Sequence, residues 1–197
     1  MTLVIKNGSP MTTFRPLIGD LQERAPLDRG LREMAHLLSA ACDSWSLPRP
    51  LVSRENAYTR TRVHREGRFE VVLLNWAAGA FSAIHDHGGQ HCWMSVLEGS
   101  LWVDDFVRLD KGERAGFARI EARDSRLLSP GHLDLRSGPL DLHRVGATAG
   151  APAISLHVYA APLRKYNVYD ELSDRCQTVI GTYDDVLGER QRLAPIR

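Results

Sequence analysis

The stretch GAFSAIHDHGGQHCWMSVLEG, from Gly79 to Gly99, contains two histidines one residue apart and a cysteine shortly after them. On a β-strand, residues two apart project to the same face, so the imidazoles of His85 and His87 point together and Asp86 points away. Two neutral imidazoles on a rigid strand form half of a metal site, whereas an isolated His-x-His pair more often lies on a solvated strand face. Asp86 is therefore a poor ligand candidate.

Short β-forming runs flank this stretch, separated by turns that contain glycine or proline. Many short strands at regular spacing predict an all-β sandwich or barrel. At 197 residues the chain suits a single domain. The runs expected to form strands are Phe69–Trp76, Ser82–His87, Cys92–Leu97, Ser100–Val107, Phe117–Glu121, Ser125–Leu128, Leu140–Val145 and Ala153–Ala160.

A helical region precedes the strands. Leu31, Met34, Leu38 and Ala41 recur at helical spacing. The prolines at positions 48 and 50 end that region, because proline disrupts helix continuation. We expect a helical segment at about 16–46 that packs on the outside of a barrel at about 58–162. Residues 163–197 are assigned only as a C-terminal extension.

The composition excludes several classes of protein. A net charge of +1 does not point to a nucleic-acid or membrane partner. The first ten residues contain no secretory signal, and the chain has no apolar run of the length of a membrane span. The three cysteines are far apart, which does not indicate a disulfide framework and suits a reducing compartment. We expect a cytoplasmic monomer.

The spacing of the residues from Gly79 to Gly99 resembles the first motif of the cupins, with Cys92 at the position usually occupied by a glutamate ligand. The run from Gly138 to His143 matches the core of the second cupin motif, which ends in a third histidine. The asparagine expected shortly after that histidine is not found. Cupins are double-sheet jelly rolls, so the resemblance implies one cupin domain over 1–197 with the metal inside the barrel.

Further motifs narrow the resemblance to the cysteine dioxygenases, over roughly half the chain from Tyr58 to Pro162. The cysteine in place of glutamate is one of them. The others are Tyr58-Thr59-Arg60, Ile84-His85-Asp86-His87, His91-Cys92, Leu142-His143-Arg144-Val145 and Ser155-Leu156-His157-Val158-Tyr159, which stand in the family's order and spacing. The resemblance implies that His85, His87 and His143 bind Fe(II), and that L-cysteine and O2 react there to give a sulfinic acid.

The ligand set itself agrees with a thiol substrate. Three neutral imidazoles leave the 2+ charge of Fe(II) uncompensated, which favours an anionic ligand such as a thiolate, because metal coordination deprotonates a thiol. Zinc remains an alternative, since three histidines and a water also form a hydrolytic site. The choice of iron rests mainly on the resemblance.

Arg60 is the candidate for binding the substrate carboxylate. A guanidinium group makes paired, charge-assisted hydrogen bonds to a carboxylate in a fixed geometry. The resemblance associates an arginine at this position with cysteine, and its absence with 3-mercaptopropionate, and it places Tyr58 beside the substrate. Arg62 and Arg65 are close in sequence, so the sequence alone leaves open which arginine reaches inward.

Ser155, His157 and Tyr159 alternate along one expected strand and share a face. Such a row can form a hydrogen-bond relay that orients the phenol toward the metal, and the alternative is an ordinary polar barrel interior. We assign catalytic roles to all three and to Cys92, and place Tyr159 and His157 beside the substrate. The animal members that this chain resembles join the matching cysteine and tyrosine through a thioether, which implies a Cys92–Tyr159 cross-link. Cys92 could equally be a plain buried thiol.

Three functions therefore remain open. The first is a cysteine dioxygenase. The second is a dioxygenase of another small thiol, such as 3-mercaptopropionate or mercaptosuccinate. The third is a non-catalytic or zinc-bearing cupin. Tyr166, which stands where animal members carry a pocket cysteine, makes the exact thiol less certain than the type of reaction.

Overall fold

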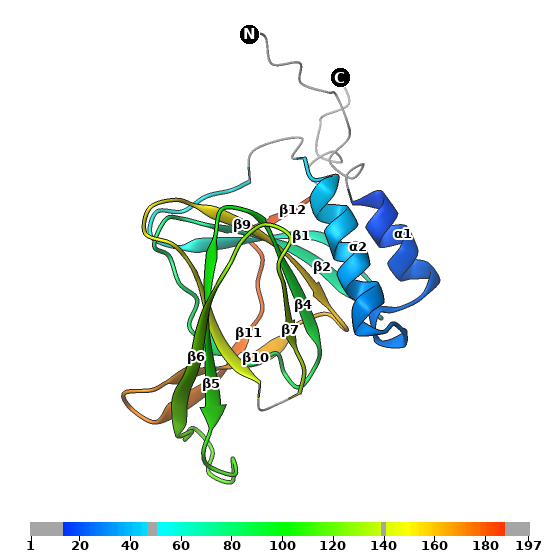
Figure 1. Cartoon of the computed structure of the whole chain (residues 1–197). Helices are drawn as coiled ribbons and strands as arrows, with labels where there is room; N and C mark the ends of the chain where they lie inside the picture. The colour runs from blue at the N-terminus through cyan, green and yellow to red at the C-terminus, as the bar shows by residue number, and fades with distance from the viewer. Residues whose placement is uncertain (1–13, 47–50, 139–140, 188–197) are drawn as a thin grey trace, which may run out of the picture.

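The computed structural model describes residues 14–46, 51–138 and 141–187 (Figure 1). The expectations for the first ten residues, for the prolines at 48 and 50, and for residues 139–140 of the second motif lie outside these ranges. The elements are α1 (Arg15–Glu23), η1 (Pro26–Asp28), α2 (Leu31–Asp43), β1 (Tyr58–Arg65), β2 (Glu70–Trp76), β3 (Ile84–His85), β4 (Cys92–Glu98), β5 (Leu101–Arg108), β6 (Ile120–Leu128), β7 (Leu133–Arg136), β8 (Leu142–Ala147), β9 (Ala153–Tyr159), β10 (Lys165–Asp170), β11 (Arg175–Ile180) and β12 (Asp185–Val186).

The strands form two six-stranded sheets. The first sheet has the order β12-β1-β2-β9-β4-β7, and the second has the order β11-β10-β3-β8-β5-β6. All described pairings are antiparallel except that of β12 with β1. This confirms the predicted all-β cupin fold, although the hydrogen-bonded ladders form two separate sheets and not one closed barrel.

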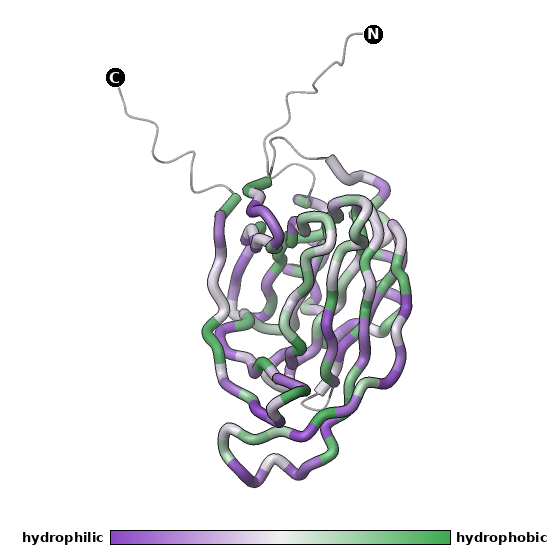
Figure 2. Tube along the Cα trace, turned by 90° about the vertical axis from the view of Figure 1, so that its left-hand side faces the viewer, coloured by the Kyte–Doolittle hydropathy of each residue, from purple (hydrophilic) through white to green (hydrophobic). Residues whose placement is uncertain are grey.

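The first sheet is buried on both faces, because apolar side chains alternate between two cores. Val71 and Leu73 of β2 pack in a core with the helices. Val72 and Leu74 belong to a second core, which lies between the two sheets. Apolar and polar stretches follow one another along the chain trace in Figure 2. The central strands of this sheet consequently read as continuous apolar runs.

The two helices cover the outer face of the first sheet, as predicted (Figure 1). In α2 the side chains of Met34, Leu38 and Ala41 are buried, and together they form the stripe that contacts the sheet. Leu31, at the first position of the helix, remains 55% exposed. Thus three of the four residues that the helical spacing singled out are buried in this contact, and Leu31 is not. Neither described helix has the length and apolar character needed to cross a membrane.

Several expected elements differ from those observed. The run Ser125–Leu128 and the last two residues of the run Phe117–Glu121 belong to a single strand, β6, and the run expected at Ser82–His87 is reduced to β3. The residues after 162, for which the sequence predicts little structure, form β10, β11 and β12. Because β10 pairs with β3, these residues lie directly beside the first histidine motif.

Gly99 allows the turn between β4 and β5 to approach the start of β9. Its backbone has φ +71°, and a Cβ atom there would lie 2.4 Å from the carbonyl oxygen of Pro152. Gly131 has a similar φ of +84°, but a Cβ atom there would meet nothing within 4 Å. The two glycines thus share the backbone constraint and differ in the space available.

We predict that Gly99→Ala lowers the free energy of unfolding by about 1–3 kcal/mol more than Gly131→Ala does, because overpacking adds to the cost of the left-handed backbone. Equilibrium denaturation in urea measures both variants against the wild type. Equal losses in the two variants would contradict the assigned contact with Pro152.

Candidate metal centre and adjoining pocket

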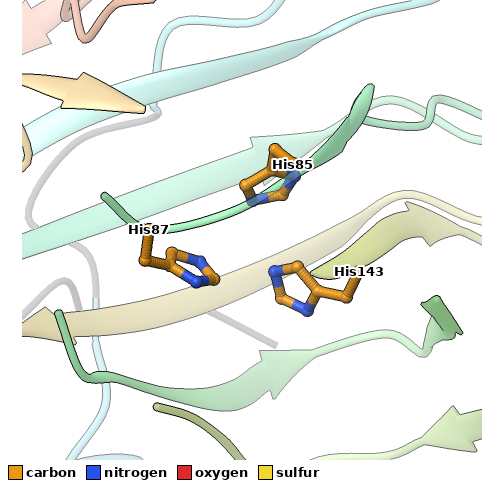
Figure 3. Close-up of side chains that lie close together, drawn as sticks. All are labelled: His85, His87 and His143. Carbon is orange, nitrogen blue, oxygen red and sulfur yellow. The ribbon is translucent and has the colours of Figure 1, made fainter. Parts of the chain in front are cut away.

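Three histidines of the second sheet converge on one point. His85 ends β3 and His143 lies on β8, and the two residues are direct partners in the antiparallel register. His87 follows β3. One nitrogen from each imidazole lies within 4.8 Å of the others, and the three rings face one another in Figure 3. The structure therefore brings together all three predicted metal ligands.

The three imidazoles are held in the neutral form. Burial, reinforced by His143, lowers the pKa of His85 to about 3. Burial also lowers the pKa of His87 and that of His143. The His85 Nδ1 atom lies 2.9 Å from the carbonyl oxygen of Ala83, so its other nitrogen is left for a ligand. Neutral imidazole is the form that binds metals.

Buried ring nitrogens without hydrogen-bond partners also indicate a metal. Nδ1 of His87 and both ring nitrogens of His143 are buried and have no such partner. Unpaired buried polar atoms are costly unless a ligand or ion satisfies them. The donor set of three imidazoles within reach of one another therefore fits a transition metal such as iron or zinc.

Asp86 points away from the three rings, as predicted, and anchors the loop that carries them. Its carboxylate accepts hydrogen bonds of 2.8–2.9 Å from the backbone of Gly88 and Asn167, the side-chain amide of Asn167, and the hydroxyl of Tyr169. Burial opposes its charge, but these hydrogen bonds lower the pKa of Asp86. The histidine motif is thereby fixed to β10.

Side chains of the first sheet line a pocket next to His85. The pocket is lined by Tyr58, Arg60, Leu74, Trp76, Ser82, Ala83, His85, Val145, His157, Tyr159, Leu163, Tyr166 and Val168. Four of the predicted residues, Tyr58, Arg60, His157 and Tyr159, are thus in one cavity with a predicted metal ligand. Both sheets contribute to the pocket: Arg60, His157 and Tyr159 come from the first sheet, and His85 and Tyr166 from the second.

Arg60 reaches inward, whereas its two neighbours do not line the pocket. The side chain of Arg60 is buried, and its Nη2 atom has no hydrogen-bond partner. Arg62 packs over the ring of Tyr183, and Arg65 is paired with Glu70 at 3.8 Å. This resolves the choice among the three arginines that the sequence left open.

The segment before β12 holds Arg60 in place. The backbone of Arg60 exchanges hydrogen bonds of 2.8 Å with Asp184, and its guanidinium group lies 5.3 Å from the centroid of the Tyr183 ring. Burial opposes its charge, while the surrounding phenols, with Tyr159 foremost, raise the pKa of Arg60. A permanently charged group is therefore fixed in a buried site with one donor atom free.

Ser155, His157 and Tyr159 share the inward face of β9, as the alternation predicted, while Leu156 and Val158 pack against the helices. Ser155 Oγ lies 2.8 Å from His157 Nε2 and accepts a hydrogen bond of 2.9 Å from the indole nitrogen of Trp76. Burial lowers the pKa of His157 to about 3. This chain of contacts leads to Cys92, whose Sγ lies 3.9 Å from His157 Nδ1.

Cys92 and Tyr159 are direct register partners on adjacent antiparallel strands. Both side chains are buried in the core between the sheets. Burial raises the pKa of the Cys92 thiol and that of the Tyr159 phenol, so both groups keep their protons at neutral pH. The pair predicted to be cross-linked is thus placed side by side in an environment that excludes water.

Sequence reasoning missed several residues of this region. The hydrogen bond from Trp76 to Ser155 was not predicted, nor were the contacts of Tyr183 and Asp184 with Arg60. The β-forming run Val179-Ile180, followed by Gly181, was the available sequence signal for a strand and a turn just before Tyr183 and Asp184. Two charged residues that alternate on β7 behind His143, Asp134 and Arg136, were also missed.

Comparison with known proteins places the chain in a family. The profile described as cysteine dioxygenase type I matches residues 10–172. Cysteine dioxygenase type 1 of Danio rerio is 32% identical over 135 residues, covering 68% of this chain and 66% of that protein. The Homo sapiens protein of the same name is 30% identical over 135 residues, with coverage of 68% and 66%. The match thus spans slightly less than two thirds of the length of these relatives.

Among solved structures, the crystal structure of TT1209 from Thermus thermophilus has a TM-score of 0.44 and 22% sequence identity, covering 56% of this chain and 90% of that one.

The family profile covers far more than half of the chain and includes the three histidines, Arg60, Cys92 and Tyr159. The chain belongs to the cysteine dioxygenase type I family.

Proposed function

We propose that this protein is an Fe(II)-dependent thiol dioxygenase that converts L-cysteine to cysteine sulfinic acid with O2. The observation that carries the proposal is the unpaired guanidinium nitrogen of Arg60, buried in a pocket that also contains His85. A small substrate with a carboxylate at one end and a thiol at the other would satisfy both groups. The family membership supports the reaction type.

The three histidines would hold Fe(II). Bound iron would supply the Lewis acidity that favours the thiolate and the redox chemistry by which both atoms of O2 are added to sulfur. His85, His87 and His143 would contribute no charge of their own, because each is neutral. The positive charge of the site is therefore available to attract an anionic sulfur ligand.

Arg60 would orient the substrate through its carboxylate, with Tyr58 alongside. Burial raises the pKa of Tyr58 to about 12, so its hydroxyl stays protonated and can donate a hydrogen bond. Fixing a substrate at both ends places its sulfur in one position, which reduces the entropic cost of reaching the reactive geometry. Trp76, Ser155 and His157, on β2 and β9 of the same sheet as β1, would keep this wall of the pocket in a single hydrogen-bonded arrangement.

Tyr159 and Cys92 would complete the site through a thioether. The two residues face each other in register, and the cross-link would hold the phenol in one rotamer beside the substrate. Forming it removes one hydrogen from the thiol and one from the ring, with O2 as the oxidant. We also propose that the chain is one cupin domain and a cytoplasmic monomer, in keeping with its three free cysteines.

The proposed function predicts a specific order of thiols in an oxygen-uptake assay. The iron-loaded protein should consume O2 fastest with L-cysteine, and cysteamine, which lacks the carboxylate, should be poor. Arg60→Met should raise KM for cysteine by roughly 30-fold or more, since breaking a buried charge pair costs about 2–5 kcal/mol. Iron content should be unchanged.

Arg62→Met provides the matched control, because it removes the same group two positions along the strand but does not line the pocket. Preference for 3-mercaptopropionate or mercaptosuccinate would support the alternative thiol dioxygenases. No O2 uptake with any thiol, together with tight zinc binding, would support a zinc cupin and overturn the proposal.

The lowered pKa values of the ligands predict how iron binding depends on pH. Three histidines with an ordinary pKa of about 6.5 would weaken binding on the order of 10⁴-fold between pH 7 and pH 5, because each ligand must lose a proton. A lowered pKa keeps the neutral form below pH 6.5, and for His85 this holds down to about 3. The Fe(II) dissociation constant, measured by anaerobic chelator competition, should therefore change by less than about tenfold over this range. A loss of a thousandfold or more would show that the imidazoles titrate normally.

The proposed cross-link predicts a change in mass. After turnover with iron, cysteine and O2, the intact protein should be about 2 Da lighter, and the linked form should run faster on a denaturing gel because an internal loop compacts the chain. Cys92→Ser should show neither effect, and Cys176→Ser should show both. Recovery of only the free Cys92 thiol by peptide mapping after extended turnover would refute the cross-link.

A further inference from the structure

A cluster of charged side chains lies behind His143, where β7, the edge strand of the first sheet, approaches the second sheet. Asp134 and Arg136 come from β7, and both are buried, at 3% and 4% exposure. Asp105 of β5, Arg126 of β6 and Asp141 supply the other charges. The cluster takes no part in the pocket described above.

Arg136 organises this cluster. Its guanidinium group binds Asp134 through two nitrogens, at 2.7 and 2.9 Å, and also pairs with Asp105 at 2.6 Å and with Asp141 at 2.9 Å. Arg126 pairs with both Asp105 and Asp134. Such a two-point pair fixes the plane of the Asp134 carboxylate.

The fixed carboxylate of Asp134 is directed at His143. Its Oδ2 atom lies 3.5 Å from Nδ1 of that ring, and both ring nitrogens of His143 are buried without a hydrogen-bond partner, so Asp134 is the acceptor that faces Nδ1 while Nε2 is left for a ligand. The ion pairs of Asp134 with Arg136 and Arg126 favour the ionised form of this carboxylate. A carboxylate held at one nitrogen selects the tautomer whose other nitrogen is free to bind a metal.

The net charge of the cluster also favours a role for Asp134 at the metal site. Three carboxylates against two guanidinium groups leave one net negative charge in the cluster, next to a site whose ligands are all neutral. Asp134 is the carboxylate in the cluster that contacts a ligand, and it is nearly inaccessible to solvent. Asp141 is 27% exposed, so its charge is better screened.

We propose that Asp134 is a positioning residue for the metal centre: it accepts a hydrogen bond from Nδ1 of His143, presents Nε2 to the metal and supplies negative charge one bond beyond the ligand. Arg136 and Arg126 hold the carboxylate in this orientation. The inference rests on the proposed metal site, but it concerns an interaction that exists before the metal binds. The competing explanation is that the cluster only ties the two sheets together.

The test uses metal affinity and the state of the His143 ring. Asp134→Asn should weaken Fe(II) binding by about 10–100-fold in anaerobic chelator competition. Asp141→Asn is the matched control, because it makes the same change of charge in the same cluster and leaves the contact with His143 intact. It should alter the affinity by less than about threefold. Equal effects of the two substitutions would overturn the proposal.

A second variant guards against misfolding, because Asp134→Asn leaves Arg136 without its two-point ion-pair partner. The double variant Asp134→Leu/Arg136→Met removes both buried charges, and such replacements by apolar residues are often well tolerated. It should unfold at a temperature close to that of the wild type and still bind Fe(II) at least about tenfold more weakly. Wild-type affinity in this folded variant would show that the cluster is only structural.

Nitrogen NMR of the histidine rings tests, in the absence of iron, whether Asp134 sets the tautomer of His143. In the metal-free wild type, His143 should be the neutral tautomer that carries its proton on Nδ1, and in the double variant this preference should be lost. The same tautomer in both proteins would refute the role of Asp134 even if Fe(II) binding were weakened. Wild-type protein that shows the tautomer but binds no Fe(II) would instead count against the proposed function alone.

Discussion

The antiparallel pairing of β3 with β8 is the constraint on which the metal centre depends, because it sets His85 directly across from His143. β3 has only two residues, so its own backbone hydrogen bonds cannot hold it rigidly. The buried carboxylate of Asp86 compensates, since three of its hydrogen bonds fasten the loop to β10 and the fourth, from Gly88, closes the loop on itself. A satisfied buried carboxylate thus supports a motif whose neighbouring histidines remain free for a ligand.

The two sheets contribute different side chains to the candidate site. The second sheet contributes His85, His143 and Tyr166, whereas the first contributes Arg60, Tyr58, Tyr159 and the Trp76–Ser155–His157 chain. The packing of the helices on the outer face of the first sheet allows its inner face to carry these polar groups, because the apolar side chains on the other face are buried beneath the helices.

Local periodicity explains what could be predicted from the sequence. The alternation along a strand is a property of consecutive residues, and it correctly placed Ser155, His157 and Tyr159 on one face. The same argument grouped His85 with His87, although His87 lies just beyond the end of β3. The family resemblance added His143 and Arg60, which no local rule connects to the first motif. The choice of Arg60 over Arg62 required the structure, since both lie on β1 two residues apart.

Contacts between distant strands could not be predicted in this way. Asp134 approaches His143 only because β7 and β8, which belong to different sheets, lie close at that edge. Likewise, the support of Arg60 by Asp184 depends on β12 returning to pair with β1. Spacing in the sequence does not indicate that β7 lies close to β8 or that β12 pairs with β1, and neither β7 nor β12 was expected.

The claim that three histidines from one sheet form a single iron site is tested most directly by metal analysis of His143→Ala protein loaded anaerobically with Fe(II). His132→Ala, which removes an exposed histidine from a turn, serves as the control. The account predicts close to one iron per chain in the wild type and the control, and almost none in His143→Ala. Near-stoichiometric iron in His143→Ala would contradict it.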